Sequence, residues 1–592
     1  MPTFKRLLGF LSPYKREVVG SLIFAWLAMG MTILIPYLVG RAVGAIEGET
    51  DPNLAPLALA ILGAGVLRLG LTVVRRLIAG KVSVAVEFDL RERLYGRLQE
   101  LELSFFDSQQ TGQLMSRATV DLQSIRFFLG YGLIFVTQTF LTITLASIVM
   151  FAINPGLAAL ALIPVPFVVL TAMRFSRLSR PAVQEVQQRL AELTAEAEES
   201  ISGVRVVKAF AREEHMLTRF GNAVTRVFDQ NVYSTRLRAF YSPLLGFLPA
   251  IGLAIILFLG GRDVIAGDMS LEEFTAFYLY LVMLTGPMRM LGMALGMAQR
   301  AVASGNRMFE ILDREPKIAS ASGAPPLPAG PGAVEFHDVS LLYESAADTQ
   351  PALQGVSLGV AAGRTVALVG PSGSGKTSLV ALLARLYDPT SGTVAIDGAK
   401  LPDVELASIR SEVAFVADES FLFSATVAEN IAYARPRATP EEIERAARLA
   451  QAHAFIERLP KGYETVVGDR GLSLSGGQRQ RVAIARALIT DPRILILDDA
   501  TSSVDARTEE EIKRGLEQVM AGRTTFVVAH RLSTISLADE IVVMDAGRMV
   551  DRGTHDELLE RCELYREIAQ HGCEDSVFLQ RDLEEREEVA RL

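Results

Sequence analysis

Six long apolar stretches in the first half of the chain constrain its fold more than any other feature. A helix needs about 20 apolar residues to cross a bilayer core, where backbone groups must all be satisfied internally. The predicted spans are Val18–Val39, Leu54–Ile78, Gly130–Ile153, Leu157–Met173, Leu244–Ile265 and Phe274–Leu291, the fourth being interrupted by two prolines. They explain why 50% of the residues are hydrophobic and the mean hydropathy is +0.28. The first half is therefore predicted to be an all-α membrane domain with six spanning helices.

The connections between these spans predict their orientation. Three connections are short: Arg41–Asn53, Asn154–Gly156 and Ala266–Glu273. The other two, Lys81–Leu129 and Arg174–Tyr241, are long, rich in arginine and helical in composition. Because basic connections stay on the cytoplasmic side, we expect a multi-pass protein of the cell (inner) membrane with both termini inside. Helical extensions of about 20 residues would reach about 30 Å into the cytoplasm.

The second half contains a glycine-rich loop between a predicted strand, Thr365–Val369, and a predicted helix, Ser378–Leu386. The pattern Gly-x-x-x-x-Gly-Lys-Thr in this setting predicts a phosphate-binding loop, whose backbone amides converge on phosphate oxygens at a helix N-terminus. Lys376 is expected to reach the β- and γ-phosphates, and Thr377 to bind Mg²⁺. The predicted nucleotide-binding residues of this loop are Gly370, Ser372, Gly373, Ser374, Gly375, Lys376, Thr377 and Ser378. The net charge of −9 argues against a nucleic-acid partner.

Each long connection has a break at its far end, Phe105–Asp121 in the first and Glu198–Phe210 in the second. These two segments resemble the intracellular loops of ATP-binding cassette (ABC) exporters. In that family, short coupling helices at these positions dock on the nucleotide-binding domain. Arg307–Asp313 resembles the family's exit from the sixth helix.

Motifs of the second half resemble the same family. Tyr343 matches the aromatic residue that stacks on adenine, and Ile494–Asp498 matches the Walker B strand, whose Asp498 would hold Mg²⁺ through water. Leu474–Gln478 matches the signature motif, which faces the γ-phosphate of an ATP held by the opposite subunit. The resemblance therefore implies nucleotide-binding roles for Ser475, Gly476, Gly477 and Gln478. Asp505 matches the D-loop, and His530 matches the switch histidine.

This resemblance implies the fold class, the cofactors and the domain order. An all-α six-helix transmembrane domain is expected together with an α/β RecA-like P-loop nucleotide-binding domain on the cytoplasmic side, with ATP and Mg²⁺ as cofactors. The expected boundaries are 1–313 for the membrane domain, 314–333 for a linker, 334–575 for the nucleotide-binding domain and 576–592 for a charged tail. A chain with one cassette needs a second half-transporter, because two cassettes sandwich two ATP molecules.

Two residues depart from the family pattern, and both fall on the machinery of hydrolysis. Asp499 stands where the family has a glutamate that acts on the attacking water. A misplacement of about 1 Å can cost about 10²-fold in rate, and the aspartate arm is one bond shorter. Asp418 stands where the family has a glutamine that contacts Mg²⁺ and water. A carboxylate there could still bind Mg²⁺, but it adds negative charge opposite the γ-phosphate.

These features predict ATP-driven export of amphipathic compounds, drugs or lipids, by a heterodimer in which this chain carries an impaired ATP site and an intact signature motif. Two alternatives remain open: a homodimeric lipid flippase of the same fold, and an ATP-gated channel or regulatory subunit. Arg68 and Arg289 lie within or near predicted spans, where ionisable residues are candidates for function. They could instead pair with acidic groups of a partner chain or lie at the inner interface.

Overall fold

The computed structural model describes residues 2–48, 53–343, 350–418, 420–468, 471, 473–498, 517–529 and 532–571, apart from the side chains of residues 288–295, 532, 533 and 571. The chain forms two units. The first comprises Met1–Gln99 and Gly112–Arg314, and the second comprises Glu100–Thr111 and Glu315–Leu592. The short segment Glu100–Thr111 thus interrupts the helical unit in sequence and folds with the second unit.

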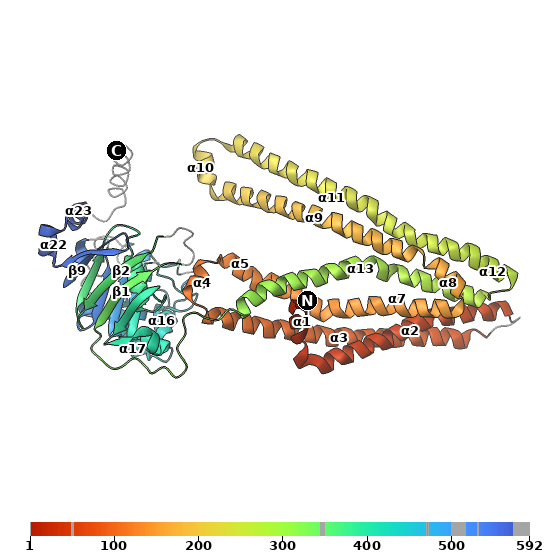
Figure 1. The fold of residues 1–592 in the computed structure, drawn as a ribbon, viewed down its shortest axis with the longest axis horizontal. Coiled ribbons are helices and arrows are strands. Elements are labelled where there is room, and N and C mark those ends of the chain that lie inside the picture. The colour runs from red at the N-terminus through yellow and green to blue at the C-terminus, as the bar shows by residue number, and fades with distance from the viewer. Residues whose placement is uncertain are drawn as a thin grey trace. The chain divides into compact units, whose positions relative to one another are not determined.

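Helices, several of them long, make up the first unit, as its apolar sequence predicts (Figure 1). They are α1 (Pro2–Gly9), α2 (Lys15–Gly48), α3 (Ala55–Glu100), α5 (Thr111–Ser116), α6 (Leu122–Phe127), α7 (Leu133–Ile153), α8 (Pro155–Ala161), α9 (Pro164–Ser202), α10 (Val204–Ala209), α11 (Glu213–Ile255), α12 (Gly261–Ala266) and α13 (Leu271–Leu312). The chain breaks after α8, and α9 begins at Pro164, a first-turn position that proline fits because no intrahelical partner awaits its missing amide.

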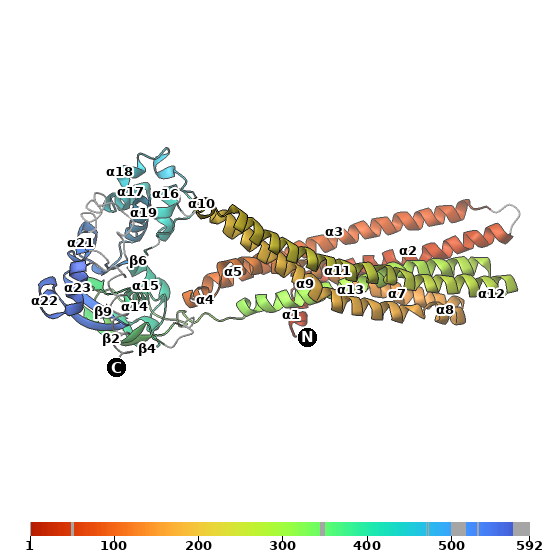
Figure 2. The same cartoon turned by 90° about the horizontal axis from the view of Figure 1, so that it is seen from above.

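Among the described residues, five helical segments are long and apolar enough to cross a membrane. They are Ser12–Glu47, Ala55–Glu100, Thr111–Ile153, Pro155–Ser202 and Glu213–Ala266. They correspond to the first five predicted spans, and the sixth predicted span lies in α13. The helices α9 and α11 run side by side in both views (Figures 1 and 2). Phe277, Tyr280 and Leu284 of α13 pack with Met150 of α7 in an apolar core.

Helix breaks occur in both long connections, where the sequence predicts them. The helix α3 ends at Glu100, and the short helix α4 (Leu103–Asp107) precedes α5. In the second connection, α9 ends at Ser202, and α10 separates it from α11. The helical content predicted for both connections and the positions of their breaks are therefore confirmed.

Two β-sheets form the framework of the second unit. The four-stranded antiparallel sheet has the order β2 (Leu353–Val360), β1 (Val334–Leu341), β4 (Ser391–Ile396) and β5 (Ala399–Lys400). The six-stranded sheet has the order β10 (Arg548–Gly553), β9 (Glu540–Asp545), β3 (Thr365–Val369), β8 (Thr524–Val528), β7 (Ile494–Asp498) and β6 (Val413–Val416). All of its neighbouring pairs are parallel except β9 with β10. The strands β3, β7 and β8 are entirely buried, which explains their continuous apolar character.

Helices cover the six-stranded sheet and build a separate lobe beside it (Figure 2). They are α14 (Lys376–Leu383), α15 (Leu406–Glu412), α16 (Val427–Ile431), α17 (Pro440–Leu449), α18 (His453–Ile456), α19 (Gly476–Leu488), α21 (Leu532–Ile535), α22 (His555–Arg561) and α23 (Glu563–His571). The helix α14 begins two residues earlier and ends three residues earlier than the predicted Ser378–Leu386. The expected fold class, a helical membrane unit followed by an α/β unit, is confirmed.

The segment expected to be a linker, residues 314–333, contains neither helix nor strand. Hydrogen bonds nevertheless tie it to the second unit. The Leu406 amide donates to the Ser320 hydroxyl at 2.8 Å, and the Glu405 amide donates to the Pro325 carbonyl at 2.8 Å. The Asp397 carboxylate accepts from the Gly332 amide at 2.9 Å. The segment is rich in proline and glycine, but these hydrogen bonds hold it along the α/β unit. The exact domain boundaries remain predictions.

Candidate functional site

The carboxyl ends of the parallel strands bring the predicted motifs to one edge of the six-stranded sheet. Gly370 follows the end of β3, and Asp498 ends β7, with β8 between these strands. Asp418 lies two residues beyond β6, the neighbour of β7. Because parallel strands end at the same edge, residues distant in sequence are placed there together, and this is where ligands bind in open α/β sheets.

The glycine-rich loop has a backbone that only glycine fits at its two ends. Gly370 has φ +154° and Gly375 has φ +97°, values that other residues adopt at a cost. A Cβ atom on Gly370 would lie 2.0 Å from the Met544 carbonyl oxygen, and one on Gly375 would lie 2.5 Å from the Ala352 carbonyl oxygen. Gly375 immediately precedes α14, so the unpaired amides of the first helical turn face the loop.

The Lys376 ammonium lies inside the concavity of this loop. Its side chain is buried, and Nζ donates to the carbonyl oxygens of Gly370 and Pro371, each at 2.7 Å. A third contact, at 3.3 Å, joins Nζ to the Ser374 hydroxyl. Anionic oxygens are stronger acceptors for an ammonium than neutral carbonyls are, so the arrangement suits a phosphate.

A hydroxyl and a carboxylate meet next to the loop. Thr377 Oγ1 donates to Asp498 Oδ1 at 3.1 Å, and Asp498 is only 6% exposed. Oxygen ligands of this kind suit Mg²⁺, which takes one or two protein ligands and completes its shell with water and substrate phosphates. Among the described residues, no group of three or more His, Cys, Asp or Glu side chains could hold a metal ion by itself. Thr377 and Asp498 fit a Mg²⁺ ion that is held jointly by these two side chains and the phosphates of a nucleotide.

The residues expected to act in hydrolysis are only partly described. Asp418 is exposed at the sheet edge that also carries Asp498. Asp499, Asp505 and His530 lie outside the described residues.

Tyr343 lies against the helix that starts the phosphate loop. Its hydroxyl donates to the Ser378 hydroxyl at 2.9 Å, and its ring meets the Tyr387 ring edge to face with centroids 5.0 Å apart. Burial raises the pKa of the Tyr343 hydroxyl, so the group stays protonated and can donate. The side chain expected to stack on adenine is therefore beside the loop expected to hold the phosphates.

Tyr387 is a residue at this site that the sequence reasoning missed. Its hydroxyl donates to Asp107 Oδ2 at 2.5 Å, although the two residues are 280 positions apart. Glu102 of the same helix break accepts from the Lys317 amide at 3.0 Å. A cavity of about 130 Å³ lies between the segment Glu100–Thr111 and Tyr343. No motif in the sequence marks Tyr387, because the contact exists only after Glu100–Thr111 has folded with the second unit.

The signature residues open α19 with a reciprocal cap. The Ser475 side chain accepts from the Gln478 amide, and Gln478 Oε1 accepts from the Ser475 amide at 2.9 Å. Ser475 is exposed, Gly476 and Gln478 are partly exposed, and Gly477 is buried. The N-terminus of α19 is thus well formed and accessible at Ser475, as a phosphate-binding helix end requires.

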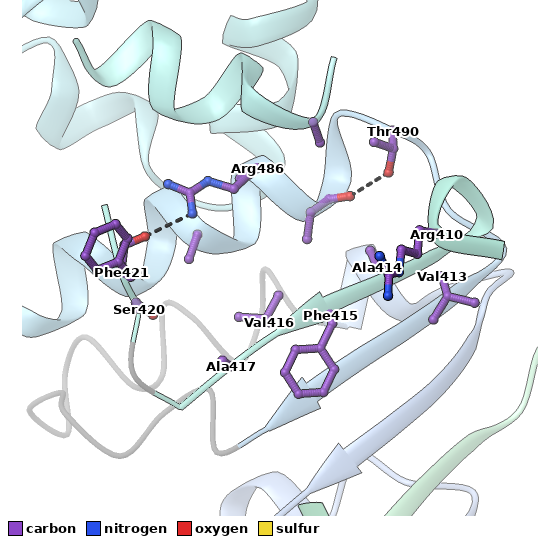
Figure 3. A pocket seen from close by; sticks show the side chains of 13 residues that line it. Arg410, Val413, Ala414, Phe415, Val416, Ala417, Ser420, Phe421, Arg486 and Thr490 are labelled. Atoms are coloured by element: carbon purple, nitrogen blue, oxygen red, sulfur yellow. Dashed lines mark hydrogen bonds between the residues drawn. The ribbon is translucent and has the colours of Figure 1, made fainter. Parts of the chain in front are cut away.

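A cavity of about 300 Å³ separates β6 from α19 (Figure 3). Phe415 and Val416 of β6 line it, and Arg486 of α19 faces them. The Arg486 guanidinium donates to the carbonyl oxygens of Phe421 and Asn430, each at 2.9 Å, and burial lowers its pKa. These contacts fix the segment after Asp418 to the signature helix.

Comparisons with known proteins agree with this architecture. Residues 18–288 match the family model of the ABC transporter transmembrane region, and residues 353–502 match the ABC transporter model. An ATP-dependent lipid A-core flippase of Syntrophus aciditrophicus is 37% identical over 571 residues, which is 96% of this chain and 94% of the relative. A multidrug efflux ATP-binding/permease protein of Mycobacterium tuberculosis is 39% identical over 565 residues, which is 95% of this chain but 47% of the relative.

A solved structure shares the fold over almost the whole chain. It is a bacterial Atm1-family ABC exporter with ATP bound, 32% identical, with a TM-score of 0.78. The match covers 94% of this chain and 97% of the other. Since both halves of the sequence match in order and over nearly the whole chain, this chain belongs to the ABC transporter family and is an ATPase-coupled transmembrane transporter of the half-transporter type.

Proposed function

We propose that this chain exports amphipathic compounds, drugs or lipids, as one subunit of a heterodimer that is driven by ATP and Mg²⁺. The observation that carries the proposal is the phosphate loop with Lys376 in its concavity and the Thr377–Asp498 pair beside it. The similarity to proteins named as multidrug efflux and lipid A-core flippase proteins supports export and this range of substrates.

The described residues of the nucleotide site have separate roles in binding ATP. The amides of the loop and of the first turn of α14 donate hydrogen bonds to the phosphate oxygens, and Lys376 neutralises the phosphate charge. Thr377 and Asp498 would hold Mg²⁺, which would supply positive charge beside the phosphates. Tyr343 stacks on the adenine ring. The cassette lies on the cytoplasmic side, because the arginine-rich long connections continue from helices that cross the membrane.

The site that this chain builds hydrolyses ATP slowly. Asp499 has a shorter arm than the glutamate of the family, and Asp418 adds negative charge at the edge where the phosphates lie. The residues of this site that bind ATP match the family pattern. The chain therefore holds ATP in a poorly hydrolysing site, and a partner subunit supplies the fast one.

The signature motif of this chain serves the partner's site. The exposed Ser475 has its hydrogen bonds within its own helical turn, to Gln478 and Arg479. Those contacts leave the end of α19 accessible to the γ-phosphate of an ATP bound by the second subunit. The M. tuberculosis relative has about twice the length that matches this chain, which supports an assembly of two halves.

A homodimeric lipid flippase is the second candidate function. The S. aciditrophicus lipid A-core flippase supports it, because that relative matches this chain over 94% of its own length. In a homodimer both sites would carry Asp418 and Asp499, so fast ATP hydrolysis by this chain alone would favour this candidate. An ATP-gated channel is the third candidate function. Uphill transport would exclude it, because a channel only lets its substrate equilibrate.

Nucleotide binding is tested most directly at Lys376. A charge-assisted hydrogen bond contributes about 1.5–3 kcal/mol, so Lys376→Ala should weaken binding of a fluorescent ATP analogue about 10- to 100-fold. Lys400→Ala, which removes an exposed lysine of β5, is the matched control and should bind normally. Equal affinity in the two variants would show that the loop does not hold the phosphates.

A further inference from the structure

A cavity of about 420 Å³ lies among four helices of the first unit. Its walls come from α2, α3, α7 and α13. Small-molecule sites in proteins commonly have volumes of about 300–1,000 Å³, so the cavity has room for a headgroup and part of an apolar chain.

Three guanidinium groups line this cavity, and all three belong to α3. Arg68, Arg75 and Arg76 each lie three or four residues from Thr72, so all three share one side of the helix with it. No carboxylate lines the cavity, and among the described residues none of the three arginines forms an ion pair. The wall therefore carries three positive charges within the predicted span Leu54–Ile78.

Arg75 has a hydrogen-bonding group that the described residues leave unsatisfied. Its Nη1 donates to Gln138 Oε1 at 3.1 Å, but its Nε is buried without a hydrogen-bond partner. A buried donor without a partner costs about 1–3 kcal/mol, and more when the group is charged. Ionisable groups at membrane depth are expensive and commonly mark a substrate path. An anion in the cavity would satisfy Nε and offset the charge.

The rest of the lining is apolar or carries hydroxyl groups. Met29, Phe135 and Met283 contribute apolar surface, and thioethers adapt their shape to different occupants. Thr72, Thr139 and Thr142 contribute hydroxyl groups. Cationic groups from α3 together with apolar side chains from α2, α7 and α13 match an amphiphile that carries its charge at one end.

We propose that this cavity binds the anionic headgroup, phosphate or carboxylate, of an amphipathic compound through Arg68, Arg75 and Arg76. The proposal rests on the proposed export function and narrows its substrate class to anionic amphiphiles. Gln138 positions the Arg75 guanidinium, and the apolar lining takes the first part of the alkyl chain. Arg289 lies in the stretch 288–295, outside the described side chains, and the proposal does not use it.

Binding is measured on the full-length exporter, with any copurifying subunit, in phosphatidylcholine nanodiscs without nucleotide. Radiolabelled dodecyl phosphate is the probe, and dodecanoate, dodecyltrimethylammonium and inorganic phosphate are competitors. We expect dodecanoate to compete and the other two to compete at least tenfold less well. Arg75→Gln should weaken binding about tenfold or more, whereas Arg75→Lys, which keeps the charge, should lose less.

The control variant is Arg180→Gln, which makes the same change at an exposed position of α9 outside the cavity. It should bind the probe normally. Equal competition by the cationic amphiphile, or unchanged binding in Arg75→Gln, would overturn the proposal. Competition by inorganic phosphate at the concentration that suffices for dodecyl phosphate would also overturn it, because the alkyl chain would then add nothing.

The outcomes distinguish a failure of the proposed export function from a failure of the proposed anion-binding site. If the wild-type protein binds dodecyl phosphate through Arg75 but never moves any amphiphile with ATP, the anion-binding site is supported and the export function is contradicted. If the protein accumulates cationic or neutral amphiphiles and Arg75→Gln leaves dodecyl phosphate binding unchanged, the export function is supported and the anion-binding site is contradicted.

Discussion

At the scale of single residues, nucleotide binding depends on an ammonium, a hydroxyl and a carboxylate group at the edge of the six-stranded sheet. The sequence motif predicts Lys376, Thr377 and Asp498 because its spacing is imposed by phosphate geometry, and the structure brings the last two within 3.1 Å. It also explains the motif's glycines, since a Cβ at Gly370 or Gly375 would collide with backbone carbonyl oxygens. Arg75 could not be predicted in this way, because its unsatisfied Nε depends on how α3 packs against α7.

The proposal that this chain's own ATP site hydrolyses slowly can be tested at Asp499 and Asp418. Asp499→Glu alone should restore little hydrolysis, because Asp418 still adds negative charge near the γ-phosphate. Adding Asp418→Gln removes that repulsion, and the two changes share one cluster, so their effects should not be additive. Single-site turnover, measured with the partner's catalytic glutamate disabled, should be clearly faster in the double variant than the product of the single effects predicts. Rapid hydrolysis by the unmodified chain alone would contradict an impaired site.

At the scale of elements, the helix breaks were predictable but their packing was not. Apolar and arginine-rich patterns predict where the long helices run and where they are interrupted. They carry no information on the contact between Asp107 and Tyr387, which are 280 residues apart and match no motif as a pair. Nor does the composition of residues 314–333 predict the hydrogen bonds that order this segment along the α/β unit.

The Asp107–Tyr387 contact predicts an effect on coupling. The segment Glu100–Thr111 continues from α3, and the Tyr387 hydroxyl fixes it beside Tyr343. Burial raises the pKa of Tyr387, so its hydroxyl stays protonated and the contact should persist through neutral pH. Tyr387→Phe should therefore lower substrate-stimulated ATP hydrolysis several-fold while leaving ATP affinity within about twofold.

The matched control for that change is Tyr433→Phe, which removes the hydroxyl of a tyrosine that is 58% exposed. Asp107→Asn should behave like Tyr387→Phe, since a neutral amide accepts a weaker hydrogen bond than a carboxylate. Normal stimulation in both variants would show that the contact does not transmit motion.

At the scale of the whole molecule, the central question is which subunit hydrolyses ATP. Ser475→Ala should reduce turnover of the assembled transporter far more than Asp499→Asn does, because we propose that Ser475 serves the partner's fast site. ATP binding by this chain's own site is the control, and it should be unchanged by Ser475→Ala. Loss of all turnover in Asp499→Asn would mean that this chain owns an essential catalytic site, which would contradict the heterodimer.

The most direct test of the account is uphill transport by the full-length protein, with any copurifying subunit, in sealed vesicles whose cassettes face outward. Anionic, neutral and cationic fluorescent amphiphiles are supplied with ATP and Mg²⁺, and their concentrations inside are followed over time. The account predicts that an amphiphile accumulates above its equilibrium level with ATP, and that Lys376→Ala abolishes this accumulation. If ATP only speeds equilibration and no amphiphile rises above its equilibrium level, the chain is not part of a pump.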